Sequence, residues 1–375
     1  MGCIEAATPI SSAAPTRRSR SRSGGSAGIR APVGVAQALG ALGLIAIVTC
    51  ALLLSAGAAS APSQFVPARS GGWPDWLAGP LRGLGVGLSN DGFQALVLTM
   101  CAGYLLVLAV ARRLPLRVLV GATALAYVIV MLGPPLISQD VFGYLSYARL
   151  GVLHGLDPYT HVAAEAPTDR VYAFIGWPFQ HSPYGPLFTL LSYALVPLGV
   201  AGGLWAFKAI AVLGALAAVA LTARAAARLG HSPSWAAAFV GLNPVMLVLA
   251  VGGAHNDTLL VAAVALALAL TANTGRARSA RSGAASAERR RERLEDDGHP
   301  RAAAGALAAG VGVKLTAGLV LPFLVLSSPR AHTRARLAWA VVLALAAVAL
   351  VGVLGFGVHA LGFLGAVGEQ QQLVA

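Results

Sequence analysis

Long apolar runs separated by short polar breaks dominate the sequence. A run of about 20 apolar residues is long enough to cross the hydrocarbon core of a bilayer as one α-helix. Such runs predict helices, because a helix satisfies its own backbone N–H and C=O groups in lipid. The expected spans are Val35–Ser60, Phe93–Ala111, Val118–Ile137, Trp205–Ala223, Ser234–Gly252, Thr258–Thr271 and Leu337–Gly357.

One stretch between these runs is longer and more polar than a simple connection needs. It begins at Ser138 and carries a carboxylate, several tyrosines, an arginine and histidines. Its apolar part, Leu187–Val200, is only about 14 residues long, a length typical of a re-entrant or interfacial helix. We therefore predict a large outer loop over 138–203 that carries interfacial helices. Functional residues concentrate on loops held by a rigid scaffold, so we expect the catalytic residues here.

A single lysine interrupts another apolar run. Lys314 lies in the middle of Gly305–Leu326, which predicts either one span or two short half-helices that meet near the lysine. In the second case, Arg330, Arg334 and Arg336 fall on the same side of the membrane as the Arg-rich segment 274–301. With either choice, the expected fold is an all-α polytopic membrane protein with about eight to ten transmembrane helices.

Composition and charge placement agree with this class. The chain is 57% hydrophobic and only 11% charged, whereas soluble domains carry roughly 25% charged residues. The formal net charge of +13 would suit a nucleic-acid-binding protein, but the arginines cluster beside the predicted spans. The positive-inside rule therefore favours a cytoplasmic basic arm over 1–34 and a cytoplasmic linker over 274–301.

The arm should be disordered, because it is rich in Ser, Arg, Pro and Gly. We expect residues 35–375 to form one transmembrane domain. The chain stops at Ala375 without a polar tail, which suggests a truncated C-terminus.

The sequence holds no Walker motif, no dinucleotide fingerprint and no G-x-S-x-G elbow. Soluble nucleotide or serine-hydrolase chemistry is therefore not supported.

Asp140 is the first candidate for chemistry. It stands at the outer end of a predicted span, and Tyr144, Tyr147 and Arg149 follow it at helical spacing. A carboxylate in such a place is a candidate general base. The alternative is a carboxylate that caps a helix end or faces water.

The tripeptide His255-Asn256-Asp257 is the second candidate. It lies between two apolar runs, where ionisable residues are costly and therefore indicate a functional site. The alternative is a polar turn at the outer interface, and no second His or Cys set supports a metal site. Lys314 is also an ionisable residue in an apolar run, where its charge is costly, and it would suit the binding of a phosphate. The alternative is a lysine at the end of a half-helix that extends its amine to the interface.

These residues, taken in order, resemble a known family. The sequence is similar to the polyprenol-phosphate-mannose-dependent α-1,6-mannosyltransferases of actinobacteria, which are integral-membrane glycosyltransferases of the GT-C type. The resemblance covers about residues 90–360. It is carried by Asp140, Tyr144, Arg149, Asp157-Pro158-Tyr159, Ser182-Pro183-Tyr184-Gly185-Pro186, Asn243-Pro244, His255-Asn256-Asp257 and Lys314.

The resemblance implies a mechanism and its substrates. The donor would be polyprenyl-phosphate-mannose, the acceptor a mannan of the lipomannan type, and the product an α linkage formed with inversion. Asp140 would act as the base, either alone or with Asp257, because Gln139 stands where many GT-C enzymes have a second acid. The resemblance places Tyr144, Arg149, Asp157, Tyr159, Tyr184, His255, Asn256, Asp257 and Lys314 in substrate binding, with Arg149, His255 and Lys314 on the donor phosphate.

Cofactor, location and competing functions complete the expectation. No cofactor is assigned, and a divalent metal stays open. The resemblance places the protein in the plasma membrane, with the N-terminus in the cytoplasm and the active site outside.

The main alternative is a GT-C transferase with another lipid-linked sugar or acceptor. A transporter would predict repeats and polar residues at the bilayer midplane, and a non-catalytic scaffold would not need Asp140, His255 and Lys314 together.

Overall fold

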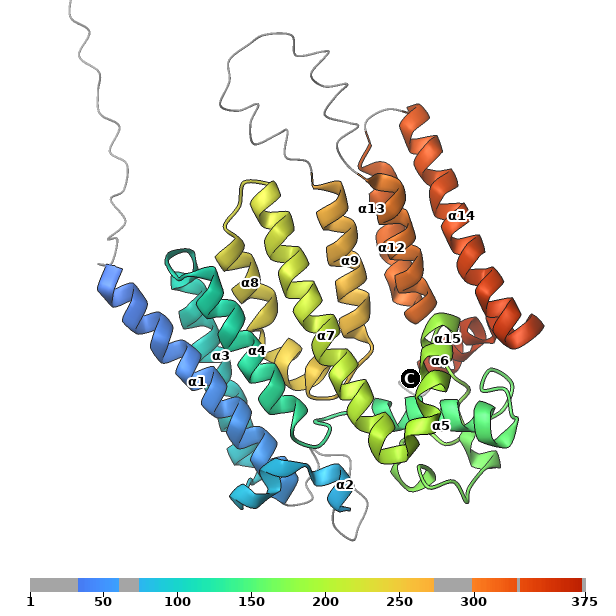
Figure 1. The fold of residues 1–375 in the computed structure, drawn as a ribbon, viewed down its shortest axis with the longest axis horizontal. Coiled ribbons are helices and arrows are strands. Elements are labelled where there is room, and N and C mark those ends of the chain that lie inside the picture. The colour runs from blue at the N-terminus through green and yellow to red at the C-terminus, as the bar shows by residue number, and fades with distance from the viewer. Residues whose placement is uncertain (1–32, 61–73, 273–298, 329–330, 373–375) are drawn as a thin grey trace, which may run out of the picture. The chain divides into compact units, whose positions relative to one another are not determined.

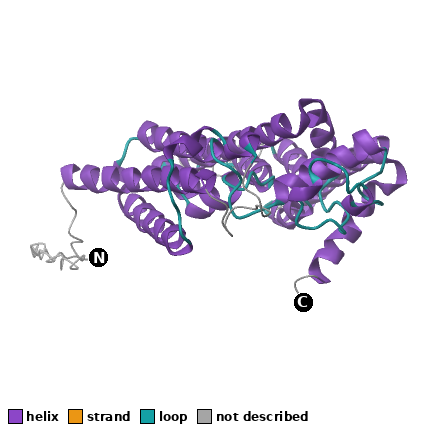
Figure 2. Ribbon diagram, turned by 90° about the horizontal axis from the view of Figure 1, so that it is seen from below, coloured by secondary structure: helices purple, strands orange, loops and turns teal. Residues whose placement is uncertain are grey.

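The computed structural model describes residues 33–60, 74–272, 299–328 and 331–372, and these form helices joined by loops, with no strand (Figures 1 and 2). The predicted arm over 1–34 and linker over 274–301 lie almost entirely outside the described residues. The all-α class expected from the apolar runs is therefore confirmed for the described part of the chain. The helices are α1 (Val33–Ser60), α2 (Asp75–Ala78), α3 (Asn90–Val110), α4 (Leu116–Met131), α5 (Asp140–His154), α6 (Pro186–Leu195), α7 (Gly199–Arg228), α8 (Pro233–Gly241), the π-helix η6 (Val245–Val251), α9 (Asp257–Thr271), α12 (Pro300–Val313), the 3-10 helix η7 (Leu315–Val320), α13 (Leu321–Leu326), α14 (Ala331–Phe356) and α15 (Gly362–Gln372).

Several helical stretches are long and apolar enough to cross a membrane. Within the described residues there are four such stretches, or five if the pair α8 and η6, bent by 49°, forms one span. Three apolar helices are shorter, at 10–17 residues. By length and composition the structure thus supports a polytopic membrane protein, with four or five crossings against the eight to ten expected. The long stretches are Gly34–Ser60, Asn90–Arg113, Pro186–Arg228 and Ala331–Ala366, and the short ones are Leu116–Met131, Asp257–Thr271 and Leu315–Leu326.

The segment expected as a large loop is built mainly on two helices. α5 begins at Asp140, and nine of its fifteen residues are buried, so it is a core helix rather than an interfacial one. α6 is short, as the length of its apolar run predicts, and the chain turns after it at Gly199, whose φ of 70° suits glycine. Two 3-10 turns, η3 (Ala163–Glu165) and η4 (Tyr172–Phe174), lie in the loop between α5 and α6.

The apolar run around Lys314 folds as two half-helices. α12 ends at Val313, Lys314 itself is extended with φ −154° and ψ 130°, and η7 and α13 follow. α12 and α13 lie side by side in Figure 1, so the chain reverses at the lysine. The backbone N–H of Gly185 donates to the carbonyl of Val313 at 3.0 Å, which ties the start of α6 to the tip of this hairpin. Of the two alternatives from the sequence, the hairpin is the one found.

The arginines and the polar candidate residues lie at opposite ends of the helices, as contacts between helix ends show. The Arg228 side chain, at the end of α7, donates to the carbonyl of Ala269 near the end of α9. Asp257 therefore lies at the other end of α9, about 20 Å away for a helix of this length. Arg112 and Arg113 lie between α3 and α4, while the far end of α4 leads to Leu136, whose N–H donates to Gly252 at 3.0 Å. The polar candidates thus gather at the end of the helices opposite these arginines.

Glycines allow α1 and α3 to approach closely. A Cβ added at Gly43 would lie 2.7 Å from the backbone oxygen of Gly103 and equally close to Val107. Small residues at helix interfaces are a common means of close packing in membranes, because dispersion contacts replace the missing hydrophobic drive. By contrast, a Cβ at Gly121 in α4 would meet nothing within 4 Å.

We predict that Gly43→Ala destabilises the protein, by about 1–3 kcal/mol, because a backbone oxygen cannot move aside as a flexible side chain can. Gly121→Ala is the matched control and should leave stability unchanged or slightly higher, because alanine favours helix over glycine by up to about 1 kcal/mol. Thermal unfolding of both variants in detergent checks this. Equal melting temperatures for the two would contradict the close packing of α1 on α3.

Candidate active site

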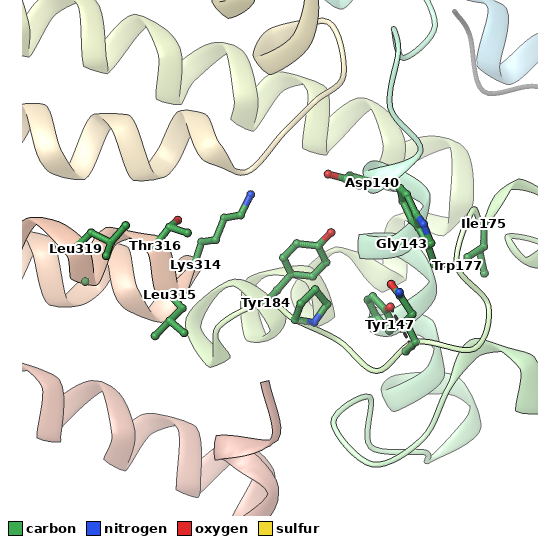
Figure 3. Close-up of a pocket in the computed structure, with 13 residues that line it drawn as sticks. Asp140, Gly143, Tyr147, Ile175, Trp177, Tyr184, Lys314, Leu315, Thr316 and Leu319 are labelled. Carbon is green, nitrogen blue, oxygen red and sulfur yellow. Dashed lines mark hydrogen bonds between the residues drawn. The ribbon is translucent and has the colours of Figure 1, made fainter. Parts of the chain in front are cut away.

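A cavity of about 660 Å³ is lined by three of the ten candidate site residues, Asp140, Tyr184 and Lys314 (Figure 3). Asp140 and Tyr147 on α5, and Lys314 at the tip of the hairpin, all line it. In Figure 3, Asp140 and Lys314 point toward the same space from opposite sides, with Tyr184 between them. The complete lining is Asp140, Gly143, Tyr147, Ile175, Trp177, Gln180, Pro183, Tyr184, Lys314, Leu315, Thr316, Gly318 and Leu319.

Four charged or titratable side chains form a continuous chain across this region. Asp140 Oδ2 lies 3.1 Å from His255 Nδ1, which lies 3.5 Å from Asp257 Oδ2. Lys314 Nζ donates to both oxygens of Asp257, at 2.9 and 2.8 Å. The four residues come from α5, the η6–α9 connection, α9 and the hairpin. Pairing of this kind stabilises ionised groups at helix ends, where unpaired ones would be costly.

Unusual backbone conformations place these side chains. Ile137 and Ala254 have positive φ values, 65° and 55°, although neither is glycine. A β-branched residue in this region is an outlier, and such strain is found where the surrounding structure enforces it, often at functional sites. The two residues precede Asp140 and His255, and the Leu136–Gly252 hydrogen bond holds their backbones together. The π-helix η6, which ends three residues before Ala254, is a further irregularity typical of functional sites.

An aromatic layer supports the tripeptide from below. Tyr144 is 1% exposed, and its ring packs edge-on against Tyr184 and Phe188, with both centroid distances 4.8 Å. Its hydroxyl accepts from the Asn256 N–H at 3.2 Å and donates to the Asn256 side-chain oxygen at 3.5 Å. Tyr144 and Asn256 are therefore brought to the site, but as buried partners of each other that orient His255 and Asp257.

Asp157 and Tyr159 do not line the cavity. Asp157 accepts from the Tyr159 N–H at 2.9 Å and lies 3.3 Å from His359, as in a side-chain-stabilised turn. The Tyr159 hydroxyl donates to the Tyr184 carbonyl at 3.0 Å and contacts the Thr189 hydroxyl at 2.9 Å. These two residues hold Tyr184 in place from behind, and substrate contact by them stays a prediction from the resemblance.

Arg149 is also outside the cavity lining. Its Nε donates to both carboxylate oxygens of Asp169, at 2.9 and 3.1 Å, and His154 contacts the same carboxylate at 2.9 Å. Burial would raise the pKa of Asp169, but these groups and the N–H of Val171 outweigh it and hold the pKa below its usual value. The arginine predicted to bind the donor phosphate is thus paired with Asp169, a loop carboxylate that no sequence pattern singled out.

A second cavity, of about 360 Å³, reaches the charged chain from another side. It is mainly apolar and is formed by α8, η6 and the start of α9, with His255 and Asp257 in its lining. Two molecules can therefore approach the charged chain from different sides. Within the described residues, no group of three or more His, Cys, Asp and Glu side chains has the arrangement of a metal site.

The helices and the site together define a polytopic membrane protein with a charged cavity at one end of its helices. Residues 37–330 match the family described as alpha-(1->6)-mannopyranosyltransferase, N-terminal domain. This match covers well over half of the chain, so the chain belongs to that family. The resemblance drawn from the sequence is confirmed at this level.

Individual relatives match over shorter regions. Alpha-(1->6)-mannopyranosyltransferase A of Mycobacterium tuberculosis is 29% identical over 235 residues, which is 60% of this chain and 40% of the relative. The protein of the same name from Corynebacterium glutamicum is 30% identical over 152 residues, 39% of this chain and 31% of the relative. The matched regions thus span less than half of these relatives. No solved structure matches the chain.

Some lining residues were not predicted. Trp177, Gln180 and Thr316 reach the cavity, although the sequence singled out none of them. The first two lie in an aromatic, proline-rich stretch before Tyr184, and that richness was the only available signal. The approach of Trp177 and Gln180 to Asp140 depends on how the loop between α5 and α6 folds back onto α5. No periodic pattern in the sequence predicts this fold of the loop.

We predict that Arg149 and Asp169 act as one unit that anchors this loop. Arg149→Gln and Asp169→Asn should each lower stability by about 1–3 kcal/mol, because each leaves a largely buried charged partner without its hydrogen bonds. The double variant should cost little more than either single one. The exposed neighbour variant Arg170→Gln is the control. Thermal unfolding in detergent measures all four, and additive losses would contradict the pairing.

The same pair predicts a pH dependence. A carboxylate whose folded pKa is lowered contributes stability that is complete above its unfolded pKa, about 4, and is lost as pH falls through the folded value. The wild-type melting temperature should therefore fall on acidification below about pH 4. Asp169→Asn should show a smaller fall over the same range, and an identical pH profile for the two proteins would argue against an ionised Asp169.

Proposed function

We propose that this protein transfers mannose from polyprenyl-phosphate-mannose to the 6-hydroxyl of an α-1,6-mannan acceptor of the lipomannan type. The observation that carries the proposal is the placement of Asp140 and Lys314 on opposite sides of one cavity. Family membership supports mannosyl transfer, and the names of the relatives specify the α-1,6 linkage for those proteins. Donor, acceptor and stereochemistry are our assignment.

Asp140 is the proposed base. Its side chain is 20% exposed, so it is open to the cavity yet partly removed from water. His255, held between Asp140 and Asp257, orients the carboxylate through its Nδ1 and limits the repulsion between the two acids. This arrangement also gives Asp257 a role. It pairs with Lys314 and His255 and organises the site, while Asp140 takes the proton.

Lys314 is the proposed partner of the donor phosphate. Its side chain is 30% exposed, and its amine lies at the end of a cavity wall made by Leu315 and Leu319. A cation beside an apolar wall suits a phosphate that carries an isoprenoid chain, and preorganised positive charge stabilises the leaving group as its charge grows. The site offers His255 as a second donor close by. Arg149 is not assigned to the phosphate, because it lies outside the cavity lining, where it pairs with Asp169.

The reaction balances with these groups alone. The acceptor oxygen attacks C1 of the mannosyl group from the face opposite the phosphate, forming the C1–O bond as the bond from C1 to the phosphate oxygen breaks. The hydroxyl proton passes to Asp140, and polyprenyl phosphate leaves beside Lys314. In-line attack inverts C1, so a β-linked donor gives an α product. In this scheme a single carboxylate is the base, without a metal in any step.

The charge distribution suggests the orientation. The arginines between α3 and α4 and at the end of α7 lie opposite the cavity, as described above. By the positive-inside rule we assign that end to the cytoplasm, and with it we propose that the cavity faces the outer side of the plasma membrane. A transferase for another lipid-linked sugar or acceptor would use the same geometry, and the choice of sugar is what the experiment must test.

We predict that Asp140→Asn lowers mannosyl transfer by about 10²–10⁴-fold, the usual contribution of a general base. Lys314→Met should also lower turnover strongly, because the leaving phosphate loses its cation. Transfer of radiolabelled mannose from polyprenyl-phosphate-mannose to a short α-1,6-mannoside, in membranes with equal amounts of each protein, measures both effects.

The control is Glu165→Gln, which removes an exposed carboxylate from the same loop and should leave transfer unchanged. Full activity of Asp140→Asn would move the base to another residue, with Asp257 the next to test. Transfer of a different sugar, but not mannose, by the wild type would favour the alternative transferase.

A further inference from the structure

An exposed aromatic side chain stands beside the proposed base. Trp177 lines the cavity together with Asp140 and is 44% exposed, although a tryptophan usually buries most of its surface. Figure 3 shows it on the Asp140 side of the cavity, away from Lys314 and Leu319. Phe179, two residues along, is 77% exposed but does not line the cavity. Tyr184 from the same loop also lines the cavity but is buried, so the indole is the exposed aromatic surface that this loop presents to the space.

The backbone that carries Trp177 is held on several sides. The Pro178 carbonyl accepts from the Ala164 N–H at 2.8 Å, and the Gln180 carbonyl accepts from the Tyr147 hydroxyl at 3.1 Å. Gly176 packs so closely on Gln139 that an added Cβ would lie 2.1 Å from its side-chain oxygen. A fixed backbone with an exposed indole is typical of a preorganised binding surface, because little conformational freedom is lost on binding.

Gln180 adds a buried polar group that lacks a hydrogen-bond partner in the described part of the chain. Its Nε2 is buried and has no hydrogen-bond partner among the residues that the structure describes, and the residue lines the same cavity. A buried amide donor without a partner is costly, and each such group calls for an explanation. A rotation of the carboxamide toward the cavity that Gln180 lines would let a ligand with hydroxyl groups supply a partner.

The geometry points to a pyranose subsite formed by Trp177 and Gln180 beside Asp140, which binds a sugar ring of the acceptor glycan. A pyranose has an apolar face of C–H groups, which stacks on a flat ring, and a rim of hydroxyls, which needs donors and acceptors. The indole serves the face, the carboxamide serves the rim, and Asp140 lies where the reacting hydroxyl has to be. The assignment of the ring to the acceptor rests on the proposed function, whereas saccharide binding at Trp177 does not.

The position of the apolar residues argues for a sugar rather than a lipid chain here. An isoprenoid chain on Trp177 would leave Gln180 and Asp140 facing hydrocarbon, which is costly for both. The apolar wall of Leu315 and Leu319 lies at the opposite side of the cavity, next to Lys314 (Figure 3). The cavity is thus divided into a sugar side and a lipid-phosphate side, and the sugar side is the acceptor subsite.

The test measures saccharide binding without a donor. The dissociation constant of a short α-1,6-mannooligosaccharide is determined by NMR titration on the full chain in detergent, for wild type, Trp177→Ala, Trp177→Phe and the control Phe179→Ala. We expect binding about tenfold weaker with alanine, about two- to threefold weaker with phenylalanine, which keeps a smaller aromatic face, and unchanged in the control. Gln180→Leu, checked for an unchanged melting temperature, should also weaken binding.

The same variants in the transfer assay should raise the KM for the acceptor and leave the KM for the donor unchanged. Saccharide binding that is equal in wild type and Trp177→Ala would overturn the subsite, as would a wild type that binds no saccharide. Binding that depends on Trp177 in a protein that transfers no mannose would keep the subsite and remove the proposed donor instead. The two proposals can therefore fail separately.

Discussion

The pairing of charges at helix ends is the interaction on which the rest of the structure depends. Partners stabilise ionised groups next to apolar helices, because removing a charge from water is costly. Here Asp140, His255, Asp257 and Lys314 contact one another in a row, although they come from three segments that are far apart in the sequence. Forming this row requires α5, α9 and the α12–α13 hairpin to meet at one end of the helices.

Breaks in the helices make that meeting possible. α12 stops at Val313, the backbone at Lys314 is extended, and the next half-helix returns beside the first. The π-helix before Gly252 and the strained residues Ile137 and Ala254 likewise interrupt regular structure just before the reactive side chains. Irregular backbone at the depth of a membrane is tolerated where it is buried in protein or lines a cavity. In this protein the irregular segments lie next to the cavity and to the charged side chains beside it.

The cavity has a chemical asymmetry that fits a transfer between a lipid and a sugar. Its Lys314 side has an apolar wall, and its Asp140 side has an indole, a carboxamide and a tyrosine. In the proposed reaction, such a division would hold the donor phosphate and the acceptor hydroxyl on opposite sides of the sugar carbon, which is the positioning that an in-line displacement needs. The loop that carries Trp177 and Gln180 also holds Asp169, which pairs with Arg149 on α5, so in the proposed function that pair would support acceptor binding without touching the acceptor.

The sequence by itself determined the class and the main elements, because apolar runs of membrane length and their charged flanks are local signals. It also predicted Asp140, His255, Asp257 and Lys314, since isolated ionisable residues beside such runs stand out. Only the tertiary structure decided that Arg149 pairs with Asp169, that Asp157 and Tyr159 pack behind Tyr184, and that Trp177 and Gln180 reach the cavity. Those outcomes depend on how a loop folds onto distant helices, and the residues in that loop carry no periodicity that would reveal their partners.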